Sequence, residues 1–262
     1  MNQLLNNETI IIGSRKSRLA LIQTELVADL LKQKFPNLKI KIKKIITQGD
    51  QDFSIQINDL GIFVKEIEKA LLKKEIDLAI HSAKDLPLKI PKGLKFSTVG
   101  QREDPRDCLV SFNKIKLKDL PTGSIIGTSS PRREKQILSL RPDLKTINLR
   151  GNVETRLEKI KQKKIDATIL AVAGLHRLNL KNEITEYFDF PTAAGQGALA
   201  VEYRKGDFKI EKIIKSLVVP NVEKCVQAER KFLSHHGDGC YSAIGVTAKI
   251  SKKGKIELIS NS

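Results

Sequence analysis

A glycine-rich segment near the C-terminal end of the chain, residues 234–240 (SHHGDGC), presents a thiol among small and polar side chains. A cysteine in such a loop is exposed, and its thiolate is a soft nucleophile. Cys240 is therefore predicted to tether a covalently bound group. Two alternatives stay open: a zinc site using the two histidines, Asp238 and Cys240, whose spacing matches no familiar zinc finger, or an inert thiol.

Residues 128–133 (TSSPRR) place two arginines at a predicted helix start. Ser130 is a favourable N-cap and Pro131 a favourable first helical residue. Arg132 and Arg133 therefore fall in the first turn, where a positive charge opposes the helix dipole. An anion that shares the free backbone N–H groups would explain both arginines. The alternative is that both side chains extend into water.

The same arrangement recurs at two other strand-to-helix turns. Arg150 ends a predicted strand and Arg156 lies in the next helix, with a Gly-Asn turn between them. Arg15 and Ser17 follow the first predicted strand. Arginine holds a carboxylate or phosphate through two parallel N–H groups. Because open α/β sheets bind ligands at the carboxyl ends of their parallel strands, these turns are predicted anion-binding positions.

An acid and a base lie side by side in residues 80–87 (IHSAKDLP), directly after a predicted buried strand. A carboxylate at Asp85 that faces several arginines stays ionised and can stabilise a transient cation. The alternatives are an ordinary surface pair of Lys84 and Asp85 and, for His81, a histidine packed in the core.

The chain of 262 residues has 47 Lys and Arg against 30 Asp and Glu, a formal net charge of +17. This balance favours an acidic partner: nucleic acid, an anionic membrane surface or a small polyanion. Nucleic-acid binding has little support, because aromatic residues make up 5% of the chain and tryptophan is absent. Part of the charge belongs to a solvated strand face, since Lys39, Lys41 and Lys43 alternate with apolar residues.

No apolar run approaches the ~20 residues of a membrane span, and residues 1–10 lack the pattern of a signal peptide. We therefore expect a cytoplasmic protein. Cys108, Cys225 and Cys240 are widely spaced, which indicates free thiols. The first two lie in apolar patterns and are predicted to be buried packing residues.

Strands and helices are predicted to alternate, which favours two α/β domains with largely parallel sheets. The first series begins with a strand over residues 10–12, a Gly13-Ser14 turn and a helix. A second series starts near Cys108 and continues over residues 124–171, of which the apolar run at residues 167–171 is a predicted strand. A helix after Pro220 and a hairpin over residues 244–259 predict a small third domain.

The order of these segments resembles that of the porphobilinogen deaminases, also called hydroxymethylbilane synthases, over residues 11–250. The matching segments are, in chain order, RKS with LAL (residues 15–21), GIFVKE (61–66), HSAKD (81–85), GTSSPRR (127–133), RGNVETR (150–156), AGL (173–175), AAGQG (193–197) and the Cys240 loop. One departure is Gln48, which stands where the family typically has arginine.

The resemblance implies an α/β fold with two lobes of the periplasmic-binding-protein type and a small α+β C-terminal domain. Domain 1 would span residues 8–100 and 194–217, domain 2 residues 101–193, and domain 3 residues 218–262. The active site would lie in the cleft between the first two. Domain 3 would be short at its C-terminal end compared with the family.

The resemblance also implies residue roles. Cys240 would hold a dipyrromethane cofactor through a thioether, Asp85 would be the main catalytic group, and no metal would be needed. The residues implied to bind acetate and propionate side chains are Arg15, Ser17, Lys84, Thr128, Ser129, Arg132, Arg133, Arg150, Arg156 and Arg177.

The implied activity is that of a transferase in tetrapyrrole and heme biosynthesis. Four porphobilinogen molecules would be joined with loss of ammonia, and hydrolysis would release the linear hydroxymethylbilane. The substrate would be the partner, with no nucleic acid or membrane, and the protein would be a monomer. The alternative is a non-catalytic two-lobed anion-binding module or an inactive truncated homologue.

Overall fold

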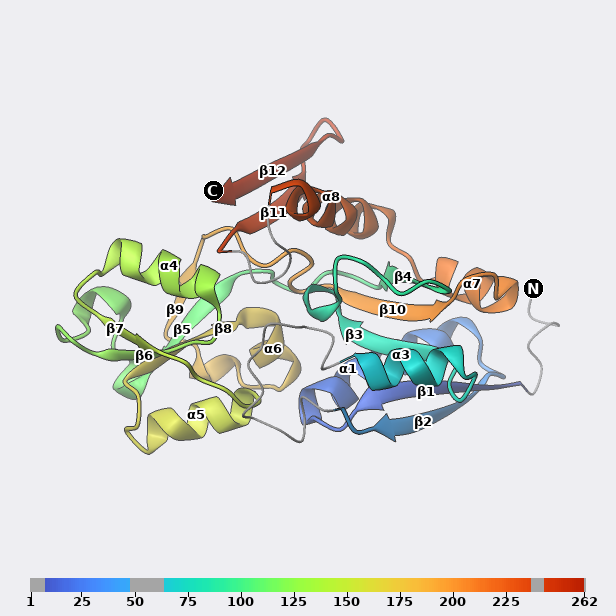
Figure 1. The fold of residues 1–262 in the computed structure, drawn as a ribbon, viewed down its shortest axis with the longest axis horizontal. Coiled ribbons are helices and arrows are strands. Elements are labelled where there is room, and N and C mark those ends of the chain that lie inside the picture. Colours follow the sequence, from blue (N-terminus) through green and yellow to red (C-terminus); the bar gives the residue numbers. More distant parts are fainter. Residues whose placement is uncertain (1–7, 48–63, 237–242, 262) are drawn as a thin grey trace. The chain divides into compact units, whose positions relative to one another are not determined.

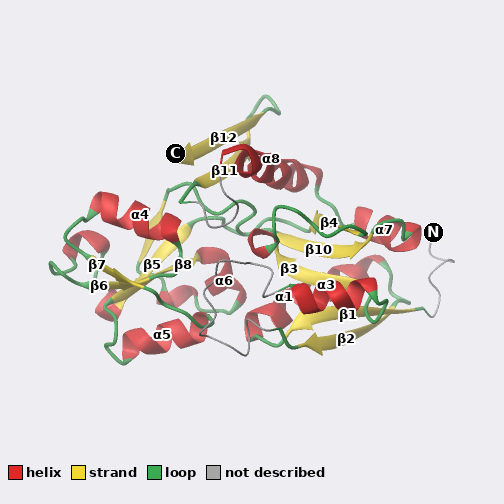
Figure 2. Cartoon of the chain, in the orientation of Figure 1, coloured by secondary structure: helices red, strands yellow, loops and turns green. Residues whose placement is uncertain are grey.

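The computed structural model describes residues 8–47, 64–236 and 243–261. Contacts within the chain divide it into two units. Unit 1 comprises Met1–Arg102 and Ala198–Ala228, and unit 2 comprises Glu103–Gly197 and Glu229–Ser262. Figure 1 labels the elements in chain order, and Figure 2 distinguishes helices from strands.

Unit 1 is built on a five-stranded sheet with the strand order β2-β1-β3-β10-β4. Its strands are β1 (Thr9–Arg15), β2 (Lys39–Ile45), β3 (Leu78–Ser82), β4 (Leu94–Val99) and β10 (Leu199–Arg204). Strand β1 is parallel to β2 and β3, whereas β10 is antiparallel to β3 and β4. Four of the five strands therefore run in the same direction and β10 is reversed, so the sheet is largely parallel, as predicted, with one antiparallel strand.

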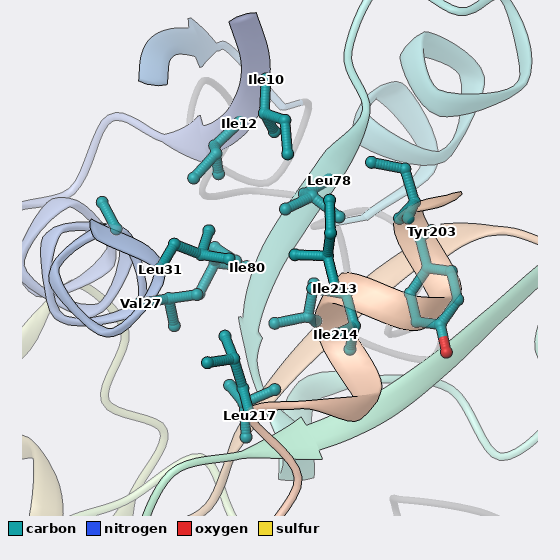
Figure 3. Close-up of a cluster of buried hydrophobic side chains, with 14 of the residues drawn as sticks. Ile10, Ile12, Val27, Leu31, Leu78, Ile80, Tyr203, Ile213, Ile214 and Leu217 are labelled. Carbon is teal, nitrogen blue, oxygen red and sulfur yellow. The ribbon is translucent and has the colours of Figure 1, made fainter. Parts of the chain in front are cut away.

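Helices α1 (Arg18–Lys34), α3 (Lys65–Leu72) and α7 (Phe208–Lys215) cover this sheet. Figure 3 shows the core in which side chains of β1 and β3 meet those of α1 and α7, among them Ile12, Leu31 and Ile214. Helix α3 packs on the opposite face, where Ile67 and Leu71 contact residues that alternate with those of the first core.

Unit 2 repeats this plan with the strand order β7-β6-β8-β5-β9. Its strands are β5 (Asp107–Ser111), β6 (Ile125–Gly127), β7 (Lys145–Ile147), β8 (Ala167–Ala171) and β9 (Glu186–Phe188). Strand β6 is parallel to β7 and β8, and β5 is antiparallel to β8 and β9. This sheet too is largely parallel, as predicted, and β5 is its one reversed strand.

In the described part of unit 2, its sheet is covered by helices α4 (Pro131–Leu140), α5 (Val153–Lys161) and α6 (Val172–Arg177). Ile137 of α4 packs with Ile126 and Ile169 in one core, while Leu157 of α5 and Leu175 of α6 pack in another. Short 3-10 helices complete both units: η3 (Ala83–Asp85), η4 (Phe112–Lys114), η5 (Leu117–Asp119) and η6 (Lys181–Glu183).

Helix α8 (Pro220–His236) begins in unit 1 and ends in unit 2. The hairpin of β11 (Gly245–Ile250) and β12 (Ile256–Asn261) belongs to unit 2. Strand β11 is largely buried, whereas the apolar side chains of β12 are each more than 40% exposed: Ile256, Leu258 and Ile259. These elements match the helix and hairpin predicted for a third domain, whose separate status stays a prediction.

One predicted turn is in fact strand. Gly13 and Ser14 lie inside β1, which continues to Arg15. A Cβ atom on Gly13 would lie 2.4 Å from Cδ1 of Ile76. The glycine therefore permits close packing against its neighbour, and the chain turns only after it.

Candidate functional site

The first strand-to-helix turn of unit 1 contains two predicted anion-binding residues. Arg15 ends β1 with a half-buried side chain, and Ser17 is the N-cap of α1. The Ser17 hydroxyl accepts a hydrogen bond from the backbone N–H of Ala20 at 3.4 Å. A capping hydroxyl accepts in this contact and keeps its own hydrogen to donate, so Ser17 can cap the helix and bind an anion.

Lys84 and Asp85 lie in η3, directly after β3. The backbone N–H of Ala83 donates to the carbonyl of Ala198 at 3.0 Å, which continues the pairing of β3 with β10 into this turn. Ala83 and Leu86 are fully buried, whereas the side chains of Lys84 and Asp85 are half-buried. The turn is thus anchored by its buried neighbours, and the Asp85 side chain on it stays partly exposed to solvent.

His81 is a core histidine. Its Nε2 lies 3.1 Å from Oε2 of Glu202 on β10, and both side chains are buried. The structure therefore confirms the packed alternative for His81.

The second strand-to-helix turn, in unit 2, forms as predicted at Ser130. This residue caps α4 by accepting from the backbone N–H of Arg133 at 3.4 Å, and Pro131 opens the helix. Thr128 accepts from the backbone N–H of Ser130 at 3.1 Å, and the Ser129 hydroxyl donates to the carbonyl of Leu149. Both hydroxyls thus order the turn itself.

Asp107, the first residue of β5, is the carboxylate that Arg132 and Arg133 face. Its Oδ1 lies 2.7 Å from Nη2 of Arg133, and its Oδ2 lies 2.8 Å from Nη1 of Arg132. Arg133 also donates to the carbonyl of Ile169 at 2.9 Å. All three charged side chains are buried, so the alternative in which the arginines extend into water is wrong.

This buried cluster carries a net positive charge, because one carboxylate faces two guanidinium groups. Burial opposes ionisation of Asp107, but the charges of Arg133 and Arg132, with hydrogen bonds from Arg133 and Gln196, hold its pKa below the usual range. Burial lowers the pKa of Arg132, and Asp107 opposes that shift.

The third turn brings Arg150 and Arg156 to the start of α5. Asn152 caps this helix by accepting from the backbone N–H of Thr155 at 2.8 Å. Nε of Arg156 donates to the carbonyl of Gly151 at 2.9 Å. Burial and the charge of Arg133 together lower the pKa of Arg156 to about 10. Arg156 is therefore a cation that an anion would stabilise.

Arg177 is the last residue of α6, and its Nη2 donates to the carbonyl of Gly197 at 2.7 Å. Burial lowers the pKa of Arg177, and the charge of Glu103 opposes that shift. The neighbouring His176 lies 3.1 Å from Oε1 of Glu103. The backbone carbonyl thus orients the guanidinium group of Arg177.

Cys240 lies outside the described residues, as does Asp238. His235 and His236 end α8, and their Nδ1 atoms donate to the carbonyls of Lys231 and Phe232. The described cysteines are buried, as predicted for Cys108 and Cys225. Burial, with the charge of Asp107, raises the pKa of Cys108 to about 12, so its thiol is unreactive at neutral pH.

Sequence reasoning missed two residues of this arrangement. Asp107 is the counter-charge of the arginine cluster, and Gln196 donates to its Oδ1 at 2.9 Å. A local signal existed for Asp107, because an acid at the head of a fully buried strand requires a positive partner. The AAGQG segment that contains Gln196 is one of the segments that resemble the family, but nothing local indicates its contact with β5.

The fold of the two units defines the structural class of this protein. The periplasmic VFT2 domain of BvgS from Bordetella pertussis has a similar structure, with a TM-score of 0.50 and 13% identity over 86% of this chain and 92% of that chain. The likeness concerns the fold alone. The chain has two sheet-and-helix domains of the periplasmic-binding-protein type and a small C-terminal sheet, as expected.

The family follows from sequence comparison. The model described as "Porphobilinogen deaminase, dipyromethane cofactor binding domain" matches residues 10–212. Relatives named porphobilinogen deaminase include those of Thermus thermophilus (46% identical, covering 95% of this chain and 83% of the relative) and Oceanobacillus iheyensis (49%, 90% and 79%). The chain belongs to the porphobilinogen deaminase family, whose cofactor is the predicted dipyrromethane.

None of the helices in the described part of the chain combines the length and the apolar character that a transmembrane span requires.

Proposed function

We propose that this chain is a transferase that joins four porphobilinogen molecules with loss of ammonia and releases hydroxymethylbilane by hydrolysis. The observation that carries the proposal is that the arginines of unit 2 differ in the groups that they contact. Asp107 faces Arg132 and Arg133, whereas Arg156 and Arg177 donate to backbone carbonyls. Each pyrrole of the substrate carries an acetate and a propionate. The positive charge of these arginines would bind such carboxylates.

The lowered pKa of Arg156 supports the binding of a polycarboxylate to these residues. The pKa of Arg156 falls to about 10 because burial and Arg133 disfavour its charged form. A pyrrole carboxylate at this guanidinium group would relieve both effects. The residues that we propose to bind cofactor and substrate carboxylates are Arg15, Ser17, Lys84, Thr128, Ser129, Arg132, Arg133, Arg150, Arg156 and Arg177.

Cys240 is proposed to hold the dipyrromethane through a thioether. When bound, this cofactor supplies a free pyrrole α-carbon as the nucleophile that begins the chain. Cys108 and Cys225 are buried and unsuited to this role.

Asp85 is proposed as the catalytic residue. Its carboxylate accepts a hydrogen bond from the pyrrole N–H and stabilises the positive charge that develops on the substrate ring as ammonia leaves. The same carboxylate then assists removal of the proton from the α-carbon after the new bond forms. The buried residues Ala83 and Leu86 on either side anchor the turn that carries this group.

Intact mass spectrometry tests this function. The purified protein is expected to exceed the chain mass by one dipyrromethane, and Cys240→Ser is expected to lack this increment. Cys225→Ser is the matched control and should retain it. Added porphobilinogen should extend the mass stepwise and yield hydroxymethylbilane. A wild-type protein at the bare chain mass that consumes no porphobilinogen would overturn the proposal.

The second candidate is a non-catalytic module that binds a small acidic ligand, which the same arginines favour. It predicts the bare chain mass for all three proteins. It also predicts that porphobilinogen binds and is recovered unchanged.

A further inference from the structure

Glu229 is a buried carboxylate that the proposed chemistry does not use. It lies in the part of α8 that belongs to unit 2 and is 0% exposed. Its Oε2 accepts from the backbone N–H of Gly195, and its Oε1 accepts from the backbone N–H of Ala248, both at 2.7 Å. Charge-assisted hydrogen bonds of this kind offset the cost of burying the carboxylate. They hold α8 to two other segments at once.

The two segments are the 191–197 loop and strand β11. The backbone N–H of Val246 donates to the carbonyl of Thr192 at 2.8 Å, and Thr192 N–H donates to Oγ1 of Thr247 at 3.1 Å. Val246 and Ala248 are two residues apart, so their N–H groups point to the same edge of β11. Thr192 and Glu229 therefore cover the edge that β12 does not pair.

The same loop contacts the arginine cluster. The carbonyl of Pro191 accepts from Nη1 of Arg132 at 3.3 Å and from Nε2 of Gln136 at 2.8 Å. The start of β11 is packed tightly against this carbonyl, because a Cβ atom on Gly245 would lie 2.3 Å from it. The loop thus fixes β11 relative to Arg132.

Chain order gives this arrangement its significance. Helix α8 ends at His236 and β11 begins at Gly245, and the connection between them contains Cys240. Glu229 holds α8 to the 191–197 loop seven residues before the helix ends at His236, and Thr192 holds the start of β11 to the same loop. We propose that Glu229 is a positioning residue that fixes these two elements relative to the arginine cluster, and that attachment of the cofactor depends on it. The inference rests on the proposed role of Cys240.

The test uses Glu229→Ala and Glu229→Gln, with Glu223→Ala as matched control. Glu223 lies earlier on α8 and accepts from the backbone N–H of Thr98 at 2.6 Å, within unit 1. Glutamine keeps the size of the side chain but presents a donor to one of the two N–H groups, so Glu229→Gln is the milder variant. All proteins are compared at a temperature well below their unfolding midpoints.

The first readout is the rate at which cofactor-free protein gains the dipyrromethane mass on incubation with porphobilinogen. We expect this rate to fall by about tenfold to hundredfold in both Glu229 variants, since a small misplacement of a reacting group has effects of this size. Glu223→Ala should attach the cofactor at the wild-type rate even if it is equally destabilised. A wild-type rate in folded Glu229→Gln would overturn the inference.

The second readout is independent of the cofactor. The backbone amides of Gly195 and Ala248 are expected to exchange hydrogen faster in Glu229→Gln than in the wild type, and at the wild-type rate in Glu223→Ala. Unchanged exchange at both amides would contradict the positioning role whatever the cofactor result. A wild-type protein that never gains the mass increment would instead contradict the proposed function.

Discussion

The carboxylate of Asp107 and the guanidinium group of Arg133 meet in the interior of unit 2, with Oδ1 2.7 Å from Nη2. This contact joins the start of β5 to the first turn of α4. The orientation of the 128–133 turn is therefore set by an ion pair within the chain, and any bound anion meets arginines that are already positioned.

Asp107→Asn is expected to destabilise unit 2 by about 3–5 kcal/mol, because it leaves two buried cations without their counter-charge. Urea unfolding at pH 7 measures this change. Asp143→Asn is the control, since Asp143 pairs with Arg141 near the surface and its loss should hardly move the midpoint. Equal midpoints for the two variants would contradict the structural role of Asp107.

The same pair predicts a pH dependence. Because the folded protein holds the pKa of Asp107 below its unfolded value of ~3.9, the stabilisation is complete above that pH and is lost as the pH falls further. The difference in unfolding free energy between wild type and Asp107→Asn should thus be constant from pH 5 to pH 7 and shrink below about pH 4. A difference that persists unchanged at pH 3 would be inconsistent with this assignment.

Asp85→Asn is expected to reduce turnover of porphobilinogen by at least about a hundredfold while the fold persists, as for loss of a general acid–base group. Asp119→Asn is the matched control, because Asp119, like Asp85, is the third residue of a three-residue 3-10 helix. Steady-state assays and circular dichroism of both variants separate chemistry from folding. Normal activity in Asp85→Asn would remove this residue from the mechanism.

Arg156→Gln should weaken substrate use without weakening the fold. The lowered pKa of Arg156 means that folding disfavours its charged form, so at neutral pH the substitution should leave the thermal midpoint equal or higher. Loss of a charged hydrogen bond should cost ~1.5–3 kcal/mol of binding free energy. The substitution should therefore lower kcat/KM for porphobilinogen. Arg141→Gln, at the surface pair with Asp143, should leave kcat/KM unchanged. A lowered midpoint with normal kcat/KM would show a structural residue instead.

Gly197→Ala should be more destabilising than Gly123→Ala, although both glycines have positive φ, +89° and +79°. Each alanine costs about 1–2 kcal/mol for its backbone conformation. At Gly197 the added Cβ would also lie 2.3 Å from the carbonyl oxygen of Glu103, whereas at Gly123 no described atom beyond its two chain neighbours would lie within 4 Å of it. We expect a further ~1–3 kcal/mol at Gly197, measurable by urea unfolding. Equal effects would mean that Glu103 moves aside freely.

The sequence predicted local features of the fold well. Ser130 and Pro131 marked the start of α4, and the apolar run at residues 167–171 gave β8 with the bounds that the structure has. These signals are local, because a helix cap or a short buried strand is specified by residues that are close in the chain. The same reasoning correctly placed His81 in the core as an alternative.

The remaining features depend on distant contacts. Nothing near β10 indicates that it pairs with β3 and β4 in the antiparallel sense. Asp107 meets Arg132 and Arg133 across a long separation in sequence, so the arginine motif alone indicated an external anion. The roles of the other predicted site residues stay predictions, and Cys240 lies outside the described residues.

The strand order of unit 1 has a consequence for biosynthesis. Strand β4 joins its sheet through β10, which lies between β3 and β4. During translation β4 is made long before β10, and the entire sheet of unit 2, from β5 to β9, is synthesised in the interval. The nascent chain can therefore complete the second lobe while the first still has an unpaired strand, which reverses the usual amino-terminal-first order of domain folding.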